Sequence, residues 1–246
     1  MVGASSSAAG SHAHLRTAVV WQGLAQQLAT LPAQAEVLDV GGGTGGFAVR
    51  VAEQGHRVTV VDPSPDALAI LGRRSAETQV ADRVRGVQGD ISQLADLVAA
   101  GEVATEFDLV LCHGVLDVVD DPAEALQRLA ERLRPGGDLS LLVAQRHAAV
   151  LARASAGRLA QALATLRGVD PARRFTVPEI SELLAQAGLT ETTMHAVRVF
   201  TDLVPSALVD LEPGAAGLLA ELEQEVAERP EYLALATQVH ALSRRP

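Results

Sequence analysis

The segment VLDVGGGTGG, residues 37–46, holds the glycines with the clearest chemical purpose in this chain. An apolar run ends in glycines here, as it does where a backbone turns tightly and lies close to a bound nucleotide. Gly41, Gly43 and Gly46 fit the spacing G-x-G-x-x-G, whereas Gly41, Gly43 and Gly45 fit G-x-G-x-G. The glycines alone therefore predict a nucleotide-type ligand and leave open which one.

Acidic residues at the ends of three predicted strands separate the two ligands that these spacings allow. Asp39 precedes Gly41 by two residues; a carboxylate there would repel a pyrophosphate but attract the ammonium group of S-adenosylmethionine. Asp62 can accept from ribose hydroxyls, which both cofactors possess. Asp90 can accept from an adenine amino group, with Ile91 packed on the ring. Each aspartate alone could be a helix cap, but together they favour S-adenosylmethionine over a nicotinamide dinucleotide.

Short apolar runs alternate with helical stretches, which predicts an α/β fold with a doubly wound parallel sheet. The predicted strands are Val37–Val40, Arg57–Val61, Val84–Gln88, Phe107–Cys112 and Asp138–Val143, and the predicted helices are Gly45–Gln54, Pro65–Arg74, Ile91–Ala99 and Pro122–Leu133. The same patterns predict an amphipathic segment at His12–Ala29, a helix at Pro178–Gln186, a strand near Thr193–Phe200, an acidic helix at Ala215–Glu228 and a β-like run at Tyr232–Leu242.

The segment LRPGGDLSLLV, residues 133–143, reads as a helix end, a Pro-Gly-Gly turn and a buried strand. With the glycine loop and the three aspartates, it resembles the class I S-adenosylmethionine-dependent methyltransferases. That resemblance implies a Rossmann-like sheet of seven strands, mostly parallel with an antiparallel C-terminal strand, and S-adenosylmethionine as cofactor. The run at Tyr232–Leu242 would supply the antiparallel strand.

Most of the chain is similar to a narrower group, the bacterial tRNA 5-carboxymethoxyuridine methyltransferases, which methylate a carboxylate on the wobble uridine. The similar segments are LRTAVVWQGL, VLDVGGGTGGFAVRVAEQGHRVTVVD, LVLCHGVLDVVDDPAEAL, AVRVFTDLVP and ELEQEVAERPEYLALATQVHAL. The AVRVFTDLVP segment and the C-terminal one are more distinctive than the glycine loop. The resemblance implies that the chain is an enzyme that modifies tRNA.

The same resemblance assigns roles to individual residues. Arg16 would bind the cofactor's carboxylate, a role that suits a guanidinium group. The remaining cofactor contacts would come from Gly41, Gly42 and Gly43 in the loop, Asp62 at the ribose, Gly89, Asp90 and Ile91 at the adenine, and Asp39 and His113 beside the cofactor. His113 could equally be a packed, hydrogen-bonded histidine, and Arg16 a solvated residue on a helix face.

Departures from the group's pattern gather on the expected substrate side. Asp117 and Val118 stand where that group has a Glu-Trp pair, and Thr201 and Leu203 stand where it has His and Tyr. Cofactor use is therefore better supported than the identity of the methyl acceptor.

A basic segment follows the fifth predicted strand. Residues 144–175 contain six arginines and one acid, Asp170, a net charge of +5 in a chain of net charge −10. We expect residues 144–177 to form a helical, Arg-rich insert on the substrate side that contacts tRNA or a small anionic substrate; a solvated helix face is the alternative. The candidates for orienting the substrate are Arg198, His113, Arg146, Arg173 and Arg174.

The whole-chain features fit this interpretation. The length of 246 residues suits one domain, here residues 12–246, after a small, polar segment at 1–11 that reads as a disordered tail. A single cysteine, Cys112, excludes an intramolecular disulfide and a clustered-thiolate metal site. No apolar run approaches the roughly 18 residues of a membrane span, and no signal peptide is recognisable. We therefore expect a cytoplasmic protein with neither a metal nor a membrane partner.

The predicted reaction is in-line methyl transfer to a carboxylate, which is already ionised at pH 7 and needs no strong general base. Three alternatives stay open at this point. The acceptor could be a small acidic or hydroxylated metabolite, the chain could bind the cofactor without catalysis, or it could be a nicotinamide oxidoreductase.

Overall fold

Seven strands form a single sheet in the order β3-β2-β1-β4-β5-β7-β6 within the part of the chain described by the computed structural model. That model describes residues 4–246, with side chains from residue 15 onward except at positions 206 and 210. The strands are β1 (Glu36–Val40), β2 (Arg57–Asp62), β3 (Val84–Gln88), β4 (Phe107–His113), β5 (Leu133–Ala144), β6 (Thr190–Val197) and β7 (Gln238–Arg244). The Rossmann-like α/β fold with antiparallel C-terminal strands is thereby confirmed.

Strands β1 to β5 pair with one another in parallel, and most residues of β1, β2, β4 and β5 are buried. Val40 at the end of β1 is level with Val61 of β2 and Cys112 of β4. Because these strands share one direction, their carboxyl ends meet at one edge of the sheet, where α/β folds bind ligands. The glycine loop follows β1, Asp39 and Asp62 lie at the ends of β1 and β2, and Asp90 comes just after β3.

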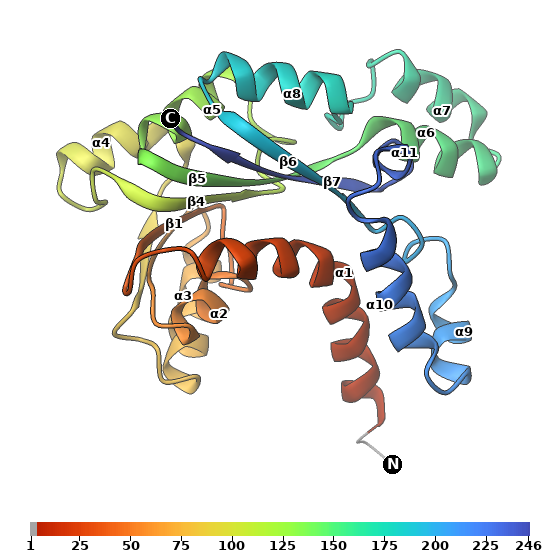
Figure 1. Cartoon of the computed structure of the whole chain (residues 1–246), viewed down its shortest axis with the longest axis horizontal. Coiled ribbons are helices and arrows are strands. Elements are labelled where there is room, and N and C mark those ends of the chain that lie inside the picture. The colour runs from red at the N-terminus through yellow and green to blue at the C-terminus, as the bar shows by residue number, and fades with distance from the viewer. Residues whose placement is uncertain (1–3) are drawn as a thin grey trace. The chain divides into compact units, whose positions relative to one another are not determined.

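The helices in chain order are α1 (Ala4–Leu28), α2 (Ala48–Glu53), α3 (Pro65–Glu77), α4 (Leu94–Ala99, after a 3-10 turn at Ile91–Gln93), α5 (Pro122–Glu131), α6 (Arg146–Ser155), α7 (Leu159–Leu166), α8 (Val177–Gln186), α9 (Ser206–Leu211), α10 (Ala215–Val226) and α11 (Pro230–Leu233). Helices α2 and α3 lie on one side of strands β1 to β4 and α5 on the other (Figure 1). Helix α3 begins where sequence chemistry places it, because Ser64 caps it and Pro65 occupies its first turn.

The chain divides into two compact units, where we expected one domain with an insert. The sheet unit comprises Gln27–Leu142, Ile180–Thr193 and Ala241–Pro246. The helical unit comprises the chain up to Gln26, Val143–Glu179 and Met194–His240. The Arg-rich segment 144–177 falls within the helical unit, where α6 packs against α7. It therefore shares a compact unit with most of α1 and with α10.

Two expectations about element boundaries need correction. The Pro-Gly-Gly segment is not a turn before the fifth strand but part of β5, where the register with β4 shifts between Phe107 and Leu109. Gly136 has a φ of 78°, which shows why glycine is needed at this irregularity. The helix expected from Gly45 begins only at Ala48, because the glycine loop occupies the intervening residues.

The N-terminus also differs from expectation. Helix α1 begins at Ala4, so residues 4–11 are helical where we expected a disordered tail, and residues 1–3 lie outside the described part. The reason lies in composition: residues 4–11 are mostly Ala and Ser without proline, so nothing stops the helix from continuing.

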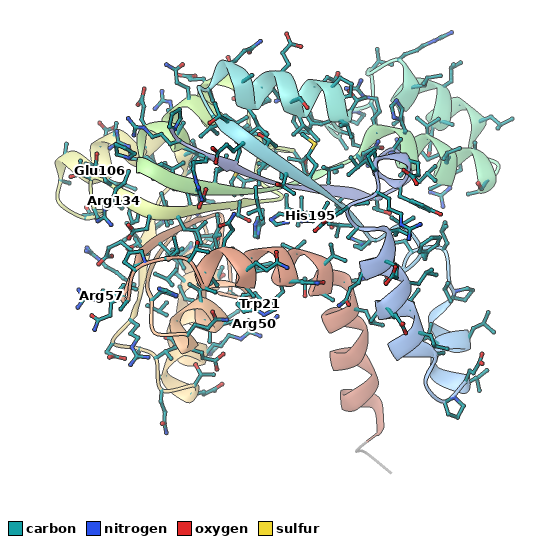
Figure 2. The ribbon with its side chains drawn as sticks, in the orientation of Figure 1. Trp21, Arg50, Arg57, Glu106, Arg134 and His195 are labelled. Atoms are coloured by element: carbon teal, nitrogen blue, oxygen red, sulfur yellow. The ribbon has the colours of Figure 1, made fainter. Side chains whose placement is uncertain are left out.

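Charged side chains line the amino-terminal edge of the sheet, opposite the ligand-binding edge. An Arg134 nitrogen lies 2.6 Å from Asp108 Oδ1, and Arg57 lies 3.8 Å from Glu36 Oε1. Figure 2 shows Arg57, Glu106 and Arg134 at this end of the strands. In the described residues no helix is long and apolar enough to cross a membrane.

Candidate functional site

The glycine loop after β1 settles which of the two spacings the backbone requires. Gly41, Gly43 and Gly45 have φ angles of 68°, 55° and 79°, a region that glycine adopts without penalty. A Cβ on Gly45 would also lie 2.2 Å from Leu71 Cδ1. Gly46 has no positive φ, and a Cβ there would meet nothing within 4 Å. The backbone therefore requires the G-x-G-x-G spacing of the S-adenosylmethionine loop.

Asp39 lies directly beneath this loop. A Cβ on Gly42 would approach Asp39 Oδ2 to 2.4 Å, so the loop can pass over the carboxylate only as glycine. Burial, with a smaller contribution from the charge of Asp62, raises the pKa of Asp39 from 3.8 to about 7. A buried carboxylate with a raised pKa marks a place where a cationic ligand group is stabilised. The arrangement fits the ammonium group for which Asp39 was predicted.

Asp62 joins the loops that follow three strands. Its Oδ2 accepts from the Gly43 amide at 2.8 Å, and its Oδ1 accepts from the Ser64 amide at 2.9 Å. Its backbone carbonyl accepts from the Gly89 amide at 3.2 Å. Each carboxylate oxygen has two lone pairs, so one remains on each for a ribose hydroxyl. Asp62 therefore organises the site as well as being able to bind a ligand.

A cavity of about 420 Å³ opens beside these loops, within the size range of small-molecule sites. Its lining residues come from the ends of β1 and β2, the 3-10 turn, the loop after β4 and α5: Val40, Gly41, Val61, Pro63, Asp90, Ile91, Ser92, Val115, Val118, Val119, Asp120, Asp121, Glu124, Ala125 and Arg128. Apolar walls with a few acidic groups suit an adenosine. The predicted residues Gly41, Asp90 and Ile91 thus come together in one cavity.

Arg128 connects two walls of this cavity. Its Nη1 donates to the Ser92 carbonyl at 2.8 Å, and its Nη2 donates to Glu124 Oε1 at 2.7 Å. Asp90 fixes the same wall, because its side chain caps the 3-10 turn by accepting from the Ser92 amide at 2.8 Å. Sequence analysis missed Arg128, whose only signal was its place on the helix after the fourth strand.

His113 lies at the end of β4 but is not among the residues that line the cavity. Its Nε2 lies 2.8 Å from Ser140 Oγ, and its ring meets that of Phe47 edge-on, with centroids 4.6 Å apart. Burial lowers the pKa of His113 to about 4. The imidazole is therefore neutral at physiological pH, and Ser140 fixes its orientation.

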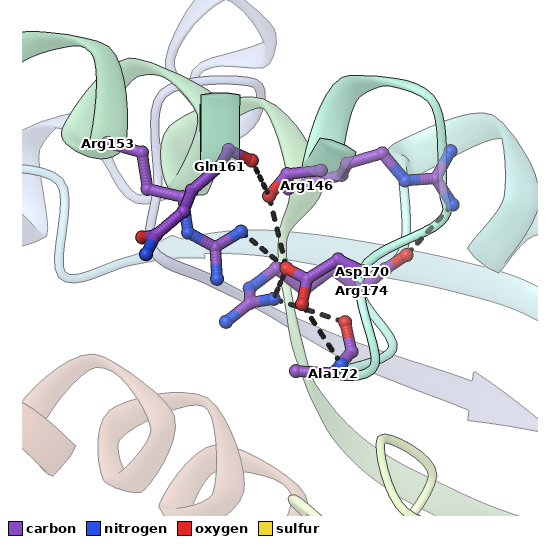
Figure 3. Close-up of polar contacts among 7 residues, drawn as sticks. Arg146, Arg153, Gln161, Asp170, Ala172 and Arg174 are labelled. Carbon is purple, nitrogen blue, oxygen red and sulfur yellow. Dashed lines mark hydrogen bonds and ion pairs between the residues drawn. The ribbon is translucent and has the colours of Figure 1, made fainter. Parts of the chain in front are cut away.

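Three of the six arginines in segment 144–177 pair with acids, two of them with Asp170 of the same segment (Figure 3). Arg153 and Arg174 both donate to Asp170, the latter at 2.8 Å. Arg146 donates to Glu179 Oε1 at 2.9 Å and to the carbonyl of Arg174 at 2.9 Å. Asp170 is already counted in the segment's net charge, so among these partners only Glu179 offsets it further.

Arg198 and Arg16 form a second group in the helical unit. The guanidinium of Arg198 donates to Gln238 Oε1 at 3.3 Å and to Asp202 Oδ1 at 2.7 Å. Arg16 lies 3.6 Å from the same Asp202 oxygen, with 58% of its side chain exposed. The structure thus joins two predicted anion-binding residues through one carboxylate. The segment AVRVFTDLVP contains Asp202, but its position four residues after Arg198 was not recognised as a signal.

Two further observations concern possible metal ligands and the single cysteine. No group of three or more His, Cys, Asp or Glu side chains there could hold a metal ion. Burial raises the pKa of the Cys112 thiol to about 12, so it is not a thiolate nucleophile at neutral pH.

Comparison with known proteins agrees with this geometry. A family model described as a methyltransferase domain matches residues 12–193. The tRNA 5-carboxymethoxyuridine methyltransferase of Escherichia coli K12 is 31% identical over 238 residues, which cover 94% of this chain and 88% of that protein. A ubiquinone biosynthesis O-methyltransferase of Xanthomonas axonopodis pv. citri is 35% identical over 161 residues, 64% of each chain.

Solved structures share the fold. A Thermotoga maritima S-adenosylmethionine-dependent methyltransferase, described as a possible histamine N-methyltransferase, aligns with a TM-score of 0.59 and 19% identity. The alignment covers 96% of this chain and 91% of that one. The Burkholderia thailandensis 1,6-didemethyltoxoflavin-N1-methyltransferase, solved with S-adenosylhomocysteine, has a TM-score of 0.53 and 24% identity, covering 93% and 78% of the two chains.

Proposed function

We propose that this chain, which belongs to the methyltransferase-domain family, methylates a carboxylate such as that of 5-carboxymethoxyuridine at the tRNA wobble position. The observation that carries the proposal is the 31% identity to the E. coli enzyme over 94% of this chain. That match extends beyond residue 193, where the family model ends, into the distinctive C-terminal segments. The proposal includes a cytoplasmic location, where tRNA is modified.

The cofactor is S-adenosylmethionine, in keeping with the family. The positive φ angles of Gly41, Gly43 and Gly45 favour it over a nicotinamide dinucleotide, because they match the G-x-G-x-G spacing. When bound, it supplies a methyl group on a positively charged sulfur. In the sheet unit Asp39 would hold its ammonium group, Asp62 its ribose, and Asp90 and Ile91 its adenine. Gly41 and Gly42 would let the backbone lie against it. Arg16, in the helical unit, remains the proposed partner of its carboxylate.

The residues of this chain need to align the acceptor and exclude water more than to move protons. A carboxylate acceptor is ionised at pH 7, so no residue must deprotonate it. His113 is neutral and hydrogen-bonded to Ser140, so we assign it a structural role at the end of β4 and not general-base catalysis. The gain in rate would come from proximity and orientation.

Arg198 is the preferred anchor for the acceptor's carboxylate. Arg146 and Arg174 are already engaged by Glu179 and Asp170. Arg198 is paired with Asp202, but its buried Nε has no hydrogen-bond partner among the described residues. Arg173 remains a candidate for contacting tRNA phosphate. A guanidinium can bind a carboxylate through two parallel hydrogen bonds, which fixes orientation as well as charge.

The direct test combines purified protein, cofactor with a labelled methyl group and tRNA. We expect label in tRNA that carries 5-carboxymethoxyuridine, recovered as its methyl ester by nucleoside mass spectrometry. A matched tRNA with unmodified uridine at the wobble position should take up none. If the modified tRNA stays unlabelled while the protein binds the cofactor, the acceptor assigned here is incorrect.

A second candidate is a small acidic or hydroxylated metabolite. The pairing of Arg146, Arg153 and Arg174 with acids favours it, because these three arginines are less available to RNA phosphates. Salt discriminates the two: binding of tRNA through phosphates must weaken steeply as salt rises, whereas binding of a small acceptor need not.

A further inference from the structure

Arg198, directly after β6, has a backbone conformation that an arginine adopts only under constraint. Its φ is 61°, in the left-handed region that side chains other than glycine rarely occupy. Such residues persist where the surrounding structure holds them, and they cluster at functional sites. Something nearby must therefore hold Arg198 in this conformation.

Glu223 of α10 supplies the constraint. Its side chain is 2% exposed. Its Oε2 accepts from the Val199 amide at 2.9 Å, and its Oε1 accepts from the amides of Phe200 at 2.9 Å and Thr201 at 2.7 Å. The Thr201 hydroxyl donates to the same Oε1 at 2.7 Å. Three consecutive amides thus converge on one buried carboxylate, an anion-binding turn filled by the chain's own acid.

The packing beneath this turn makes it rigid. Val199 is buried in a cluster with Ala196, Val226 and Ala236, and Phe200 packs against that cluster. The ring of Phe200 meets that of Tyr232 at a centroid distance of 6.0 Å. With its backbone fixed on this base, the Arg198 side chain has a defined origin and direction.

The Arg198 guanidinium is only partly satisfied within the described residues. Its Nη2 lies 2.7 Å from Asp202 Oδ1 and 2.5 Å from Oδ2, but its buried Nε has no hydrogen-bond partner there. Nε and Nη2 form one edge of the planar fork, and that edge matches both oxygens of a carboxylate. Asp202 uses the edge incompletely, through Nη2 alone.

We propose that Glu223 is a positioning residue that holds Arg198 ready for the carboxylate of the methyl acceptor, and that Asp202 is a resident carboxylate which the acceptor replaces. This inference rests on the proposed function for the identity of the acceptor, but the binding of a carboxylate by Arg198 can be tested without tRNA.

Phenoxyacetate, an aryl ether carrying a carboxymethoxy group, serves as the probe. We expect the full-length protein to bind it, as measured by calorimetry, and Glu223→Gln to weaken that binding at least tenfold. The reason is that one acceptor oxygen of Glu223 would be replaced by a glutamine Nε2, which is a donor and cannot accept from the backbone amides of the turn. Glu221→Gln, an exposed position on the same helix, is the matched control and should bind like the wild type.

Arg198→Gly separates the backbone from the guanidinium. Glycine adopts a positive φ freely, so this variant should unfold at a temperature no lower than the wild type while losing phenoxyacetate binding. It carries the test if Glu223→Gln does not fold. Asp202→Asn should bind phenoxyacetate at least threefold more tightly, because the resident carboxylate no longer competes.

The kinetic measurement uses tRNA as the acceptor. In Glu223→Gln we expect the acceptor KM to rise at least tenfold while the cofactor Kd stays within twofold. A fall in thermal stability alone, with phenoxyacetate Kd and acceptor KM unchanged, would show that Glu223 is merely structural and would overturn the proposal. The proposal would also be overturned if the wild type did not bind phenoxyacetate, if Arg198→Gly still bound it, or if Asp202→Asn bound it no more tightly than the wild type. Arg198-dependent binding without methylation of tRNA would instead refute only the proposed function.

Discussion

The glycine loop of the sheet unit and the arginine cluster around Asp170 in the helical unit differ in whether their charged groups are paired. Beneath the loop, Asp39 is buried and its pKa is raised. Around Asp170, Arg153 and Arg174 are paired with an acid of the same segment. In the first region burial destabilises the charged form of Asp39, and a cationic ligand group can offset that cost. In the second region the charges of Arg153 and Arg174 are already paired with Asp170. A count of charges along the sequence cannot tell these cases apart, but the pairing can.

The largest effect that this contrast predicts concerns the pH dependence of stability. The pKa of Asp39 rises from 3.8 to about 7 on folding, so the folded protein holds this proton more tightly than the unfolded chain. Without cofactor, stability should therefore fall as pH rises from about 4 to about 7 and then level off. At about 1.4 kcal/mol per pKa unit, the ionised carboxylate costs on the order of 4 kcal/mol above pH 7.

Asp39→Asn should remove this cost, so the variant should be more stable than the wild type at pH 8 and similar to it at pH 4. Denaturant unfolding across this range measures the difference. Parallel stability curves for the two proteins would mean that Asp39 is not the strained group described here.

The second effect concerns the glycine that separates the two sequence spacings. In Gly45→Ala the new Cβ would collide with Leu71 and the backbone would keep an unfavourable φ, a cost of about 3 kcal/mol in unfolding free energy. Gly46→Ala, where a Cβ meets open space, is the control and should be nearly neutral. Equal losses in both variants, measured by unfolding and by cofactor calorimetry, would contradict the assignment of the loop.

Third, Asp62→Ala should weaken cofactor binding about 30-fold, or about 2 kcal/mol, because the loops after β1 and β2 lose their shared acceptor as well as a partner for the ribose. Asp62→Asn keeps one acceptor oxygen and should lose less. Titration calorimetry orders the three proteins, and an asparagine variant as weak as the alanine one would argue against the two-oxygen arrangement.

A fourth, smaller effect tests the satisfied region. Asp170 accepts from Thr165 Oγ1 at 3.1 Å as well as from the two arginines. Asp170→Asn should lower stability by about 1 kcal/mol and leave cofactor affinity unchanged. Asp82→Asn, at a side chain 74% exposed, is the control. If Asp170→Asn weakened cofactor binding, the contrast between the two regions would break down.

The last prediction is an absence of effect. Because the pKa of His113 lies near 4, the imidazole does not titrate between pH 6 and 9. With cofactor and acceptor saturating, the transfer rate should change less than twofold across that range, as followed by label incorporation. A rise in rate with an apparent pKa near 6.5, lost in His113→Gln, would instead identify a general base.

The sequence predicted what short-range patterns determine. The strands near Val37–Val40, Arg57–Val61 and Val84–Gln88 lie where they were expected. The first two are mostly apolar, as burial in a parallel sheet requires, whereas only one residue of the third is buried. Asp62 ends β2 and Asp90 comes just after β3, so their place at the carboxyl edge could be foreseen. The choice between Gly45 and Gly46 could not, since it depends on φ angles and on the distant Leu71.

Pairings between distant residues escaped prediction for a related reason. Arg146 pairs with Glu179, 33 positions away, and Glu223 holds the turn that begins at Val199 from 24 positions away. Nothing local in either segment encodes these contacts, which arise only when helices pack. The sequence therefore offered no sign that Arg146, Arg153 and Arg174 are paired with acids.

Asp62 also has a consequence for how quickly the site can be filled. By tying the loops after β1, β2 and β3 to one residue, it assembles the glycine loop when the sheet unit folds and not when a ligand arrives. Little ordering is left for the moment of binding. Cofactor association should therefore follow a single exponential whose rate grows linearly with cofactor concentration, with no slow conformational phase in a stopped-flow trace.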